Sequence, residues 1–302
     1  MDTSKRKIIS ATTLAIGLML SAKGIAAESA LPKKPEVQPQ ASQSVQPDVN
    51  KKANDAIEEK RKILIADAQT AIAEAEKALQ ALNNNKNNEA LEALAIATGK
   101  LELVLARNPK LALAPVRSEV VMHDLLANKD TVKAVFKQAK EYLSDGEVQK
   151  ARPLISVLAS EIQLRTTNIP LETYPAAIKA ITPLIDAGKI DEAKARLQAT
   201  LNTLVVTNEA IPLPKLRAEH MLKAAQTLAE KKGRSKDDND KLTTNLQGAR
   251  EQLELAELLG YGTKQDYKPM YAQLDEIAKK SAAGKDGLDW FDKIKKQIAS
   301  LI

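Results

Sequence analysis

LIADAQTAIAEAEKALQALNNN, residues 64–85, is the stretch that decides which fold to expect. Its apolar side chains recur at intervals of three and four residues, which is the spacing of one face of an amphipathic α-helix. The positions on this face are Leu64, Ala68, Ala71, Ala75, Leu79 and Leu82. Three asparagines at 83–85 predict the end of the helix, because Asn favours turns over helix interiors.

The same spacing recurs along the rest of the chain. It is found at Val132, Val135, Ala139 and Tyr142, at Leu242, Leu246, Ala249, Leu253 and Ala256, and at Phe291, Ile294, Ile298 and Leu301. Good helix formers dominate the composition, and 11 Gly and 13 Pro in 302 residues are few for the many tight turns of a β-sandwich. We therefore expect an all-α fold, an irregular multi-helix bundle built from helical hairpins, with about ten helices and no strand.

A weak internal repeat supports the hairpins. Residues 82–90, 143–151 and 185–193 each combine an apolar residue, a short polar turn and an alanine, and a proline follows each at the same distance: Pro109, Pro170 and Pro212. We interpret each copy as helix, turn, helix and proline stop, with a further helix inserted at residues 111–128. A superhelical array of the tetratricopeptide type is the alternative, but the copies are offset by 61 and then 42 residues and lack its aromatic signature.

The most polar stretch of the expected folded region is KKGRSKDDNDK, residues 231–241. It predicts an exposed connection between a helix that starts near Leu213 and one that starts near Asp238. A ligand-binding run of charges is the alternative interpretation.

The N-terminal residues have the features of a secretory signal peptide. Residues 1–27 begin with the basic run at 5–7, continue with an apolar run at 8–20, and end with small residues. The apolar run is too short to span a bilayer. We expect cleavage near Ala26 or Ala27 and a periplasmic or secreted location; an uncleaved anchor is the alternative.

Residues 28–52 have a different composition. They contain four prolines, many Gln and Ser residues and few large apolar side chains. Such a segment buries too little surface to offset its chain entropy, so we expect a disordered tether rich in Pro and Gln. The helical region then covers residues 53–302.

Several classes of function are disfavoured. The chain has no Cys and 2 His, which leaves few ligands for a metal. Residues 1–27 carry four of the 45 basic and one of the 39 acidic side chains, so the remainder has a net charge of about +3, too balanced for a nucleic-acid-binding face. The sequence contains no P-loop, no Rossmann glycine fingerprint, no G-x-S-x-G elbow and no H-E-x-x-H. We expect neither an enzyme nor a cofactor.

Four residues are the candidates for binding. Tyr267 and Tyr271 are four residues apart and share a helix face, which favours a groove for an apolar ligand, although aromatics at this spacing also form cores. His123 lies beside Asp124 in an expected helix and is a candidate pH-responsive group, as is His220. Both histidines also fit ordinary, partly exposed helix positions.

The chain from Ile211 onward resembles the YfdX family of bacterial exported proteins. The resemblance is carried by IPLP at residues 211–214, AREQLELAE at 249–257 and LGYG at 259–262, and the preceding hairpins from about Ala53 fit it as well. The resemblance implies a helical, stress-associated protein with no established catalytic motif, so no active-site residue is carried over.

These observations together predict a function. We expect an exported, non-catalytic binding or chaperone-like protein linked to envelope stress such as acid or drug exposure. Its partners would be a protein or unfolded client, or a small amphipathic compound, and it would span no membrane after cleavage. A helical-hairpin scaffold that binds one envelope protein, and a self-assembling homo-oligomer, are the alternatives.

Overall fold

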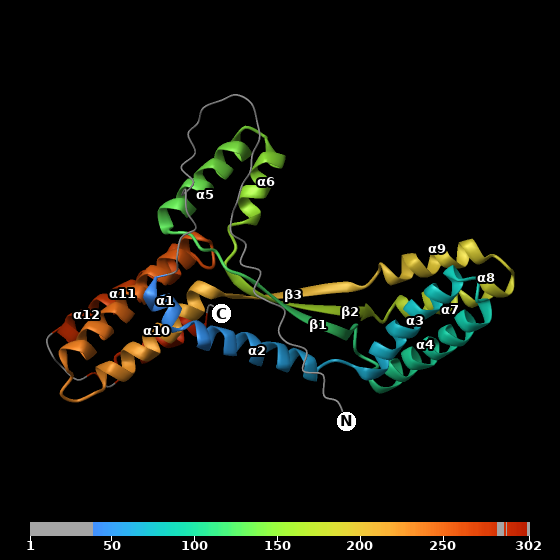
Figure 1. Ribbon diagram of the computed structural model, residues 1–302, viewed down its shortest axis with the longest axis horizontal. Helices are drawn as coiled ribbons and strands as arrows, with labels where there is room; N and C mark the ends of the chain where they lie inside the picture. The colour runs from blue at the N-terminus through green and yellow to red at the C-terminus, as the bar shows by residue number, and fades with distance from the viewer. Residues whose placement is uncertain (1–38, 283–286, 288, 301–302) are drawn as a thin grey trace. The chain divides into compact units, whose positions relative to one another are not determined.

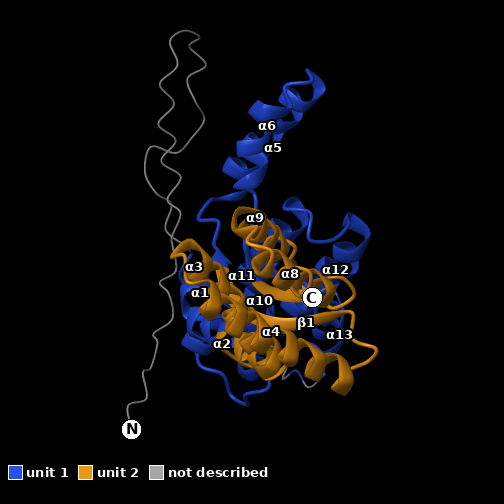
Figure 2. Ribbon diagram, turned by 90° about the vertical axis from the view of Figure 1, so that its right-hand side faces the viewer, with its two compact units in different colours: residues 1–53, 122–163, 210–302 blue, residues 54–121, 164–209 orange. Residues whose placement is uncertain are grey.

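The computed structural model describes residues 39–282, 287 and 289–300 and is mostly helical, which confirms the predicted class (Figure 1). Helices α1 to α13 alternate with three strands. The chain divides into two compact units, which Figure 2 shows in different colours. Unit 1 contains the described residues of the segments 1–53, 122–163 and 210–302, and unit 2 contains residues 54–121 and 164–209.

Unit 2 is built around two long helices, α3 (Ala66–Asn83) and α4 (Asn87–Arg107). Their buried positions are mostly alanines, and small side chains let two helices pack closely along their lengths. The short helices α7 (Tyr174–Lys179), α8 (Thr182–Asp186) and α9 (Ile190–Leu201) complete this core, with α9 against α3 and with α7 and α8 against α4. The helix predicted for residues 64–82 is confirmed from Ala66, and it ends where the asparagines predicted.

Unit 1 contains a second core. Helices α10 (Leu213–Ala229), α11 (Lys236–Leu258), α12 (Lys264–Ala282) and α13 (Asp292–Ala299) bury their apolar faces against one another. Neighbouring helices approach closely at Gly248 of α11, where a Cβ would lie 2.9 Å from both the Ala41 Cβ and the Met221 Sδ. Glycine at this position therefore allows α10 and the N-terminal helix to reach α11.

The expectation of a disordered tether is wrong for residues 40–52. These residues form α1 (Gln40–Ser44) and the beginning of α2 (Gln46–Lys62), and α1 packs on α10 and α11. The few apolar side chains here, Ala41, Val45 and Val49, are all buried, so a sparse apolar pattern suffices where an existing core accepts it. Residues 28–38 and the expected signal peptide lie outside the described residues.

The expectation of no strand is also wrong. Strands β1 (Leu113–His123), β2 (Glu161–Pro170) and β3 (Val205–Pro212) form one sheet in the order β1-β2-β3. The Leu171 amide donates to the Ala112 carbonyl, and the Ser118 and Thr166 hydroxyls lie 3.4 Å apart. Residue numbers rise along one strand as they fall along the next, so β1 and β2 are antiparallel.

The third strand continues the same pattern. The Asn168 side chain donates to the Val205 carbonyl at 3.1 Å, and the Leu213 amide donates to the Ser160 carbonyl at 2.9 Å. This pairing makes β2 and β3 antiparallel as well. The chain passes from unit 2 to unit 1 within β1 and β3 and returns within β2.

The predicted repeat corresponds to three helical hairpins, each followed by a strand. They are α3–α4 before β1, α5 (Lys129–Ser144) with α6 (Val148–Ser156) before β2, and α7 and α8 with α9 before β3. The equivalent turn residues Asn85, Gly146 and Gly188 all have left-handed φ values, of 57°, 75° and 70°. The helix expected at residues 111–128 is wrong, because these residues contain β1.

Candidate binding surface

The α5–α6 hairpin presents a solvent-exposed apolar surface in unit 1. Asn128 caps α5 by accepting from the Asp130 and Thr131 amides at 3.0 and 2.9 Å. The two helices pack through Val132, Ala139 and Ala151, which are buried. Figures 1 and 2 both show α5 and α6 projecting away from the other helices of this unit. At the base of the hairpin, Lys129 forms an ion pair with Glu254 of α11.

Four large side chains of this hairpin remain half exposed. They are Phe136 (52%), Leu143 (47%), Val148 (54%) and Ile155 (48%), and we call them the hairpin face. Each helix contributes a pair seven residues apart, two helical turns, so each pair forms a short strip. Scattered apolar residues on a surface are ordinary, but four on one small hairpin make it the candidate binding surface.

The other two copies of the repeat show what is unusual about this face. With offsets of 61 and 42 residues, Phe136 corresponds to Ala75 and Ile178, and both of these are fully buried. Leu143 corresponds to Leu82 and Ile185, and Ile155 corresponds to Leu94 and Leu197. All four of these counterparts are buried. Helices α3 and α9 contact each other in the core of unit 2. The middle hairpin therefore exposes positions that its two counterparts bury against helices.

The structure places the predicted tyrosine pair in the core of unit 1. The Tyr267 and Tyr271 rings stack with centroids 6.3 Å apart, and Tyr267 is fully buried. The Tyr267 hydroxyl donates to the Tyr261 carbonyl at 3.0 Å, and the Tyr271 hydroxyl donates to the Glu257 carboxylate at 2.7 Å. Burial, followed by the Glu257 carboxylate, raises the pKa of Tyr271. These contacts account for the pair as packing between α11 and α12, and ligand binding there stays a prediction.

Tyr261, which the sequence analysis did not select, joins this cluster to the start of β2. Its hydroxyl accepts from the Ser160 amide at 3.0 Å and donates to the Glu161 carboxylate at 2.8 Å. Burial is the main cause that raises its pKa. A hydrogen bond between residues 100 positions apart fixes the turn after α11 onto the strand, and no local sequence pattern indicates it.

The two histidines lie close to one buried ion pair. His123 is the last residue of β1, so the expected helix around it is wrong. The neighbouring Asp124 carboxylate accepts two hydrogen bonds from Arg217 of α10, at 3.0 and 2.7 Å. His220 follows Arg217 by one helical turn, and its Nδ1 lies 3.6 Å from the Asp48 carboxylate at the start of α2. Ligand binding or pH sensing by either histidine stays a prediction.

His220 also lines a shallow polar cavity of about 450 Å³ along α10, together with Glu219, Lys223, Gln226, Thr227, Glu230 and Lys295. The Lys295 ammonium donates to the Gln226 side chain at 2.5 Å, which joins α13 to α10 beside this cavity. A second cavity of about 540 Å³ lies along α13 and is lined by Asp289, Asp292, Lys293, Lys296, Gln297 and Ser300. Both linings mix charges of opposite sign, and neither includes Tyr267 or Tyr271.

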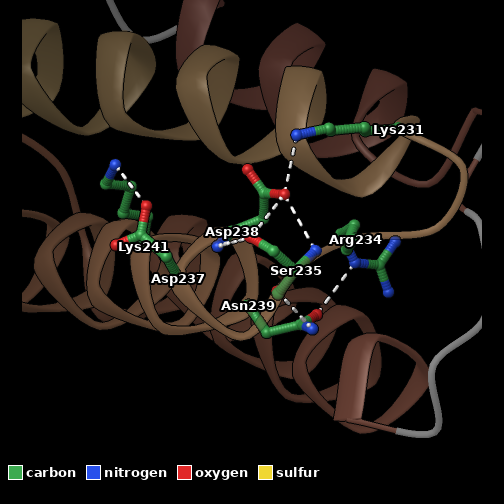
Figure 3. Close-up of polar contacts among 7 residues, drawn as sticks. All are labelled: Lys231, Arg234, Ser235, Asp237, Asp238, Asn239 and Lys241. Carbon is green, nitrogen blue, oxygen red and sulfur yellow. Dashed lines mark hydrogen bonds and ion pairs between the residues drawn. The ribbon is translucent and has the colours of Figure 1, made fainter.

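Residues 231–235 of the polar stretch connect α10 and α11, as predicted, whereas residues 236–241 form the start of α11 (Figure 3). Ser235 and Asp238 form a reciprocal capping box, and the Lys231 ammonium donates to the Asp238 carboxylate at 2.7 Å. The hydrogen bonds from Lys231 and then from Ser235 lower the pKa of Asp238. Arg234 donates to the Ala229 carbonyl at 2.8 Å and to Asn239 at 2.9 Å. These charges therefore stabilise the start of α11.

Within residues 39–282, 287 and 289–300, no group of three or more acidic or histidine side chains is placed to hold a metal ion. In the same part of the chain, none of the helices is both long and apolar enough to cross a membrane.

The fold defines a class, namely a mostly helical protein of repeated hairpins, one of which has a half-exposed apolar face. The model of the YfdX protein family matches residues 71–210, so the chain is similar to this family over that region. The matched residues include nearly all of the three hairpins and strands. The motifs from Ile211 onward, which suggested the family, lie outside the match.

A search of solved structures finds Salmonella Typhi YfdX, which is 15% identical to this chain with a TM-score of 0.35. The similarity covers 50% of this chain and 93% of the other. No match was found among the curated proteins.

Proposed function

We propose that this protein is an exported, non-catalytic binding protein with chaperone-like activity in envelope stress, and that the hairpin face is where it holds its partners. The observation that carries the proposal is the exposure of Phe136, Leu143, Val148 and Ile155 on one hairpin. The basic, apolar and small-residue segments of residues 1–27, which are typical of a signal peptide, support the location. The link to acid or drug stress rests on the resemblance to the YfdX family.

Binding at this face would use the hydrophobic effect. Fully burying a large apolar side chain contributes about 1.5–3 kcal/mol, so completing the burial of a half-exposed one contributes about 1 kcal/mol. Two such side chains account for about 2 kcal/mol, or roughly a thirtyfold change in affinity. This is enough to hold exposed apolar segments weakly and reversibly, as a chaperone-like protein requires.

The test is suppression of aggregation by the mature chain. The wild-type chain should retard light scattering by a heat-denatured test enzyme, and the double variant Phe136→Ser/Ile155→Ser should lose most of this effect. Ile63→Ser/Val206→Ser is the matched control, because these side chains are each 53% exposed but lie in unit 2. A wild-type chain without effect, or equal losses in both double variants, would refute the proposal.

The location has a separate test. Mass spectrometry of the protein recovered from the cell envelope should give a chain that begins at Ala27 or Glu28. An intact chain that keeps residues 1–27 would overturn the proposal of a cleaved, exported protein.

A further inference from the structure

The counterparts of the hairpin face indicate the shape of its partner. In the other two hairpins, the positions equivalent to Phe136, Leu143 and Ile155 are buried in a core formed by helices. The same backbone arrangement at α5–α6 therefore has the geometry to accept a helix. An extended peptide that adds to a sheet gains its affinity from backbone hydrogen bonds to a strand edge, and a helical hairpin offers none.

The residues beside the face indicate the charge of the partner. In α5, Phe136 is followed by buried Ala139, exposed Lys140 and then Leu143; in α6, Val148 is followed by buried Ala151, exposed Arg152 and then Ile155. The basic residue is four positions after the first apolar residue in both helices, about 40° around the helix from it. Lys133 extends the basic border of α5.

Both strips and both borders lie on the same side of the hairpin. Seen along the chain direction, the exposed strip of each helix lies about 40–60° around the helix axis from the buried alanine, and the direction of this rotation is the same in α5 and α6. Because α5 and α6 are joined by a short turn and run in opposite directions, this sense brings both strips to one side. The hairpin thus presents a central apolar strip with Lys133 and Lys140 along one border and Arg152 along the other.

These borders differ from those of the first repeat copy. There the positions of Lys133, Lys140 and Arg152 are occupied by Ile72, Leu79 and Leu91, all of which pack on the core of unit 2. The middle hairpin therefore keeps the apolar centre of the repeat but has cations at its edges. Among the described residues, neither Lys140 nor Arg152 has an ion-pair partner, so both are available to one.

We propose that the hairpin face binds an acidic amphipathic helix of another protein, with the apolar strip of that helix between α5 and α6 and its carboxylates against Lys133, Lys140 and Arg152. The inference rests on the proposed function and specifies its ligand. A second copy of this chain fits less well, because pairing two identical faces would bring the cationic borders together.

The test uses two fluorescent helical peptides with the same leucine strip, one bordered by Glu and the other by Lys. Fluorescence anisotropy with the mature full-length chain should give a dissociation constant roughly tenfold lower for the acidic peptide, as expected from a few exposed charge pairs. Lys140→Glu/Arg152→Glu should reverse this preference. The control Lys137→Glu/Lys150→Glu makes the same change in net charge at two lysines that already pair with Glu141 and Glu147, and it should leave the preference unchanged.

The outcomes separate this inference from the proposed function. If both peptides bind with equal affinity, and if Phe136→Ser/Ile155→Ser abolishes this binding, the charge selectivity is overturned and the proposed function stands. No binding of either peptide, with no suppression of aggregation, would overturn both. If the chain binds vesicles of phosphatidylcholine and phosphatidylglycerol more tightly than the acidic peptide, the partner is a lipid surface and the inference is overturned. If sedimentation shows a dimer that the peptide does not displace, the partner is a second copy of the chain, which also overturns it.

Discussion

Replacing Asp124 with alanine should destabilise unit 1 by about 3–5 kcal/mol, because it leaves a buried charge without its counterion. Arg217 is 2% exposed, and its guanidinium donates two hydrogen bonds to the Asp124 carboxylate and one to the Gln46 side chain at 3.0 Å. Its Nε is buried without a partner. Gln46 alone cannot neutralise the charge, so the cost should approach that of other broken buried pairs.

The single tryptophan makes unit 1 separately observable. Trp290 lies in unit 1 and packs against its core, so its fluorescence reports unfolding of that unit, while far-UV circular dichroism reports the helices of both. With a denaturant slope of about 2 kcal/mol per molar urea, the Trp290 midpoint should fall by roughly 1.5–2.5 M. Asp237→Ala is the control; its ion pair with Lys241 is exposed, and the loss should be about 0.5 kcal/mol or less.

The double variant Asp124→Leu/Arg217→Met tests the mechanism itself. Removing both charges leaves no buried ion, so this variant should be more stable than Asp124→Ala alone. A loss of unfolding free energy below about 1 kcal/mol in Asp124→Ala would refute the reasoning. It would also be refuted if the loss in the double variant equalled the sum of the losses in Asp124→Leu and Arg217→Met measured separately.

Two further predictions concern the turns. Hydrogen bonds from Lys231 and Ser235 lower the pKa of Asp238 in the folded chain, so its contribution is present above the unfolded pKa of about 3.9 and is lost as the pH falls through the folded value. The stability difference between wild type and Asp238→Asn should therefore narrow between about pH 6 and pH 2, and a constant difference in urea unfolding would contradict this. In the turn before α9, Gly188 has a φ of 70°, so Gly188→Ala should lower the free energy of unfolding by about 1–2 kcal/mol in thermal unfolding. In α4, Gly99→Ala should raise it by about 0.5–1 kcal/mol, because nothing lies within 4 Å of the new Cβ. Equal effects of the two glycine substitutions would show that backbone conformation does not determine the stability change of either one.

The helices were predictable because their signal is local. The seam of α3 and the turn signals after it follow from spacing alone, and the left-handed φ at Asn85, Gly146 and Gly188 explains why the polar turns of the repeat contain Asn and Gly. The strands were not predictable in this way. Along β2 every second residue is buried, but two of these, Thr166 and Asn168, are polar. Asn168 is buried because it hydrogen bonds to β3, and that contact is invisible in a hydrophobicity pattern.

The candidate site shows the same limit more clearly. Amphipathic spacing predicted that Val132, Ala139 and Tyr142 share a helix face, but spacing indicates only which side of a helix is apolar, and does not indicate what covers it. Phe136 and its counterparts Ala75 and Ile178 occupy the same position of one repeat, yet the first is half exposed and the other two are buried. The difference arises from tertiary contacts, because α3 has α9 as a neighbour in the core of unit 2.

This comparison also connects the fold to the proposed function. A helical hairpin with an apolar face is stable only if another element covers that face or if the exposed area stays small. The first and third hairpins cover each other, and an odd number of copies leaves the middle hairpin without a counterpart in the core of unit 2. Its small residues at the helix contact, Ala139 and Ala151, let α5 and α6 pack against each other. Its larger residues, Phe136 and Leu143, then remain available for a partner. Lys140 and Arg152 place cations beside this exposed face, and under the proposal above they would favour acidic partners over basic ones.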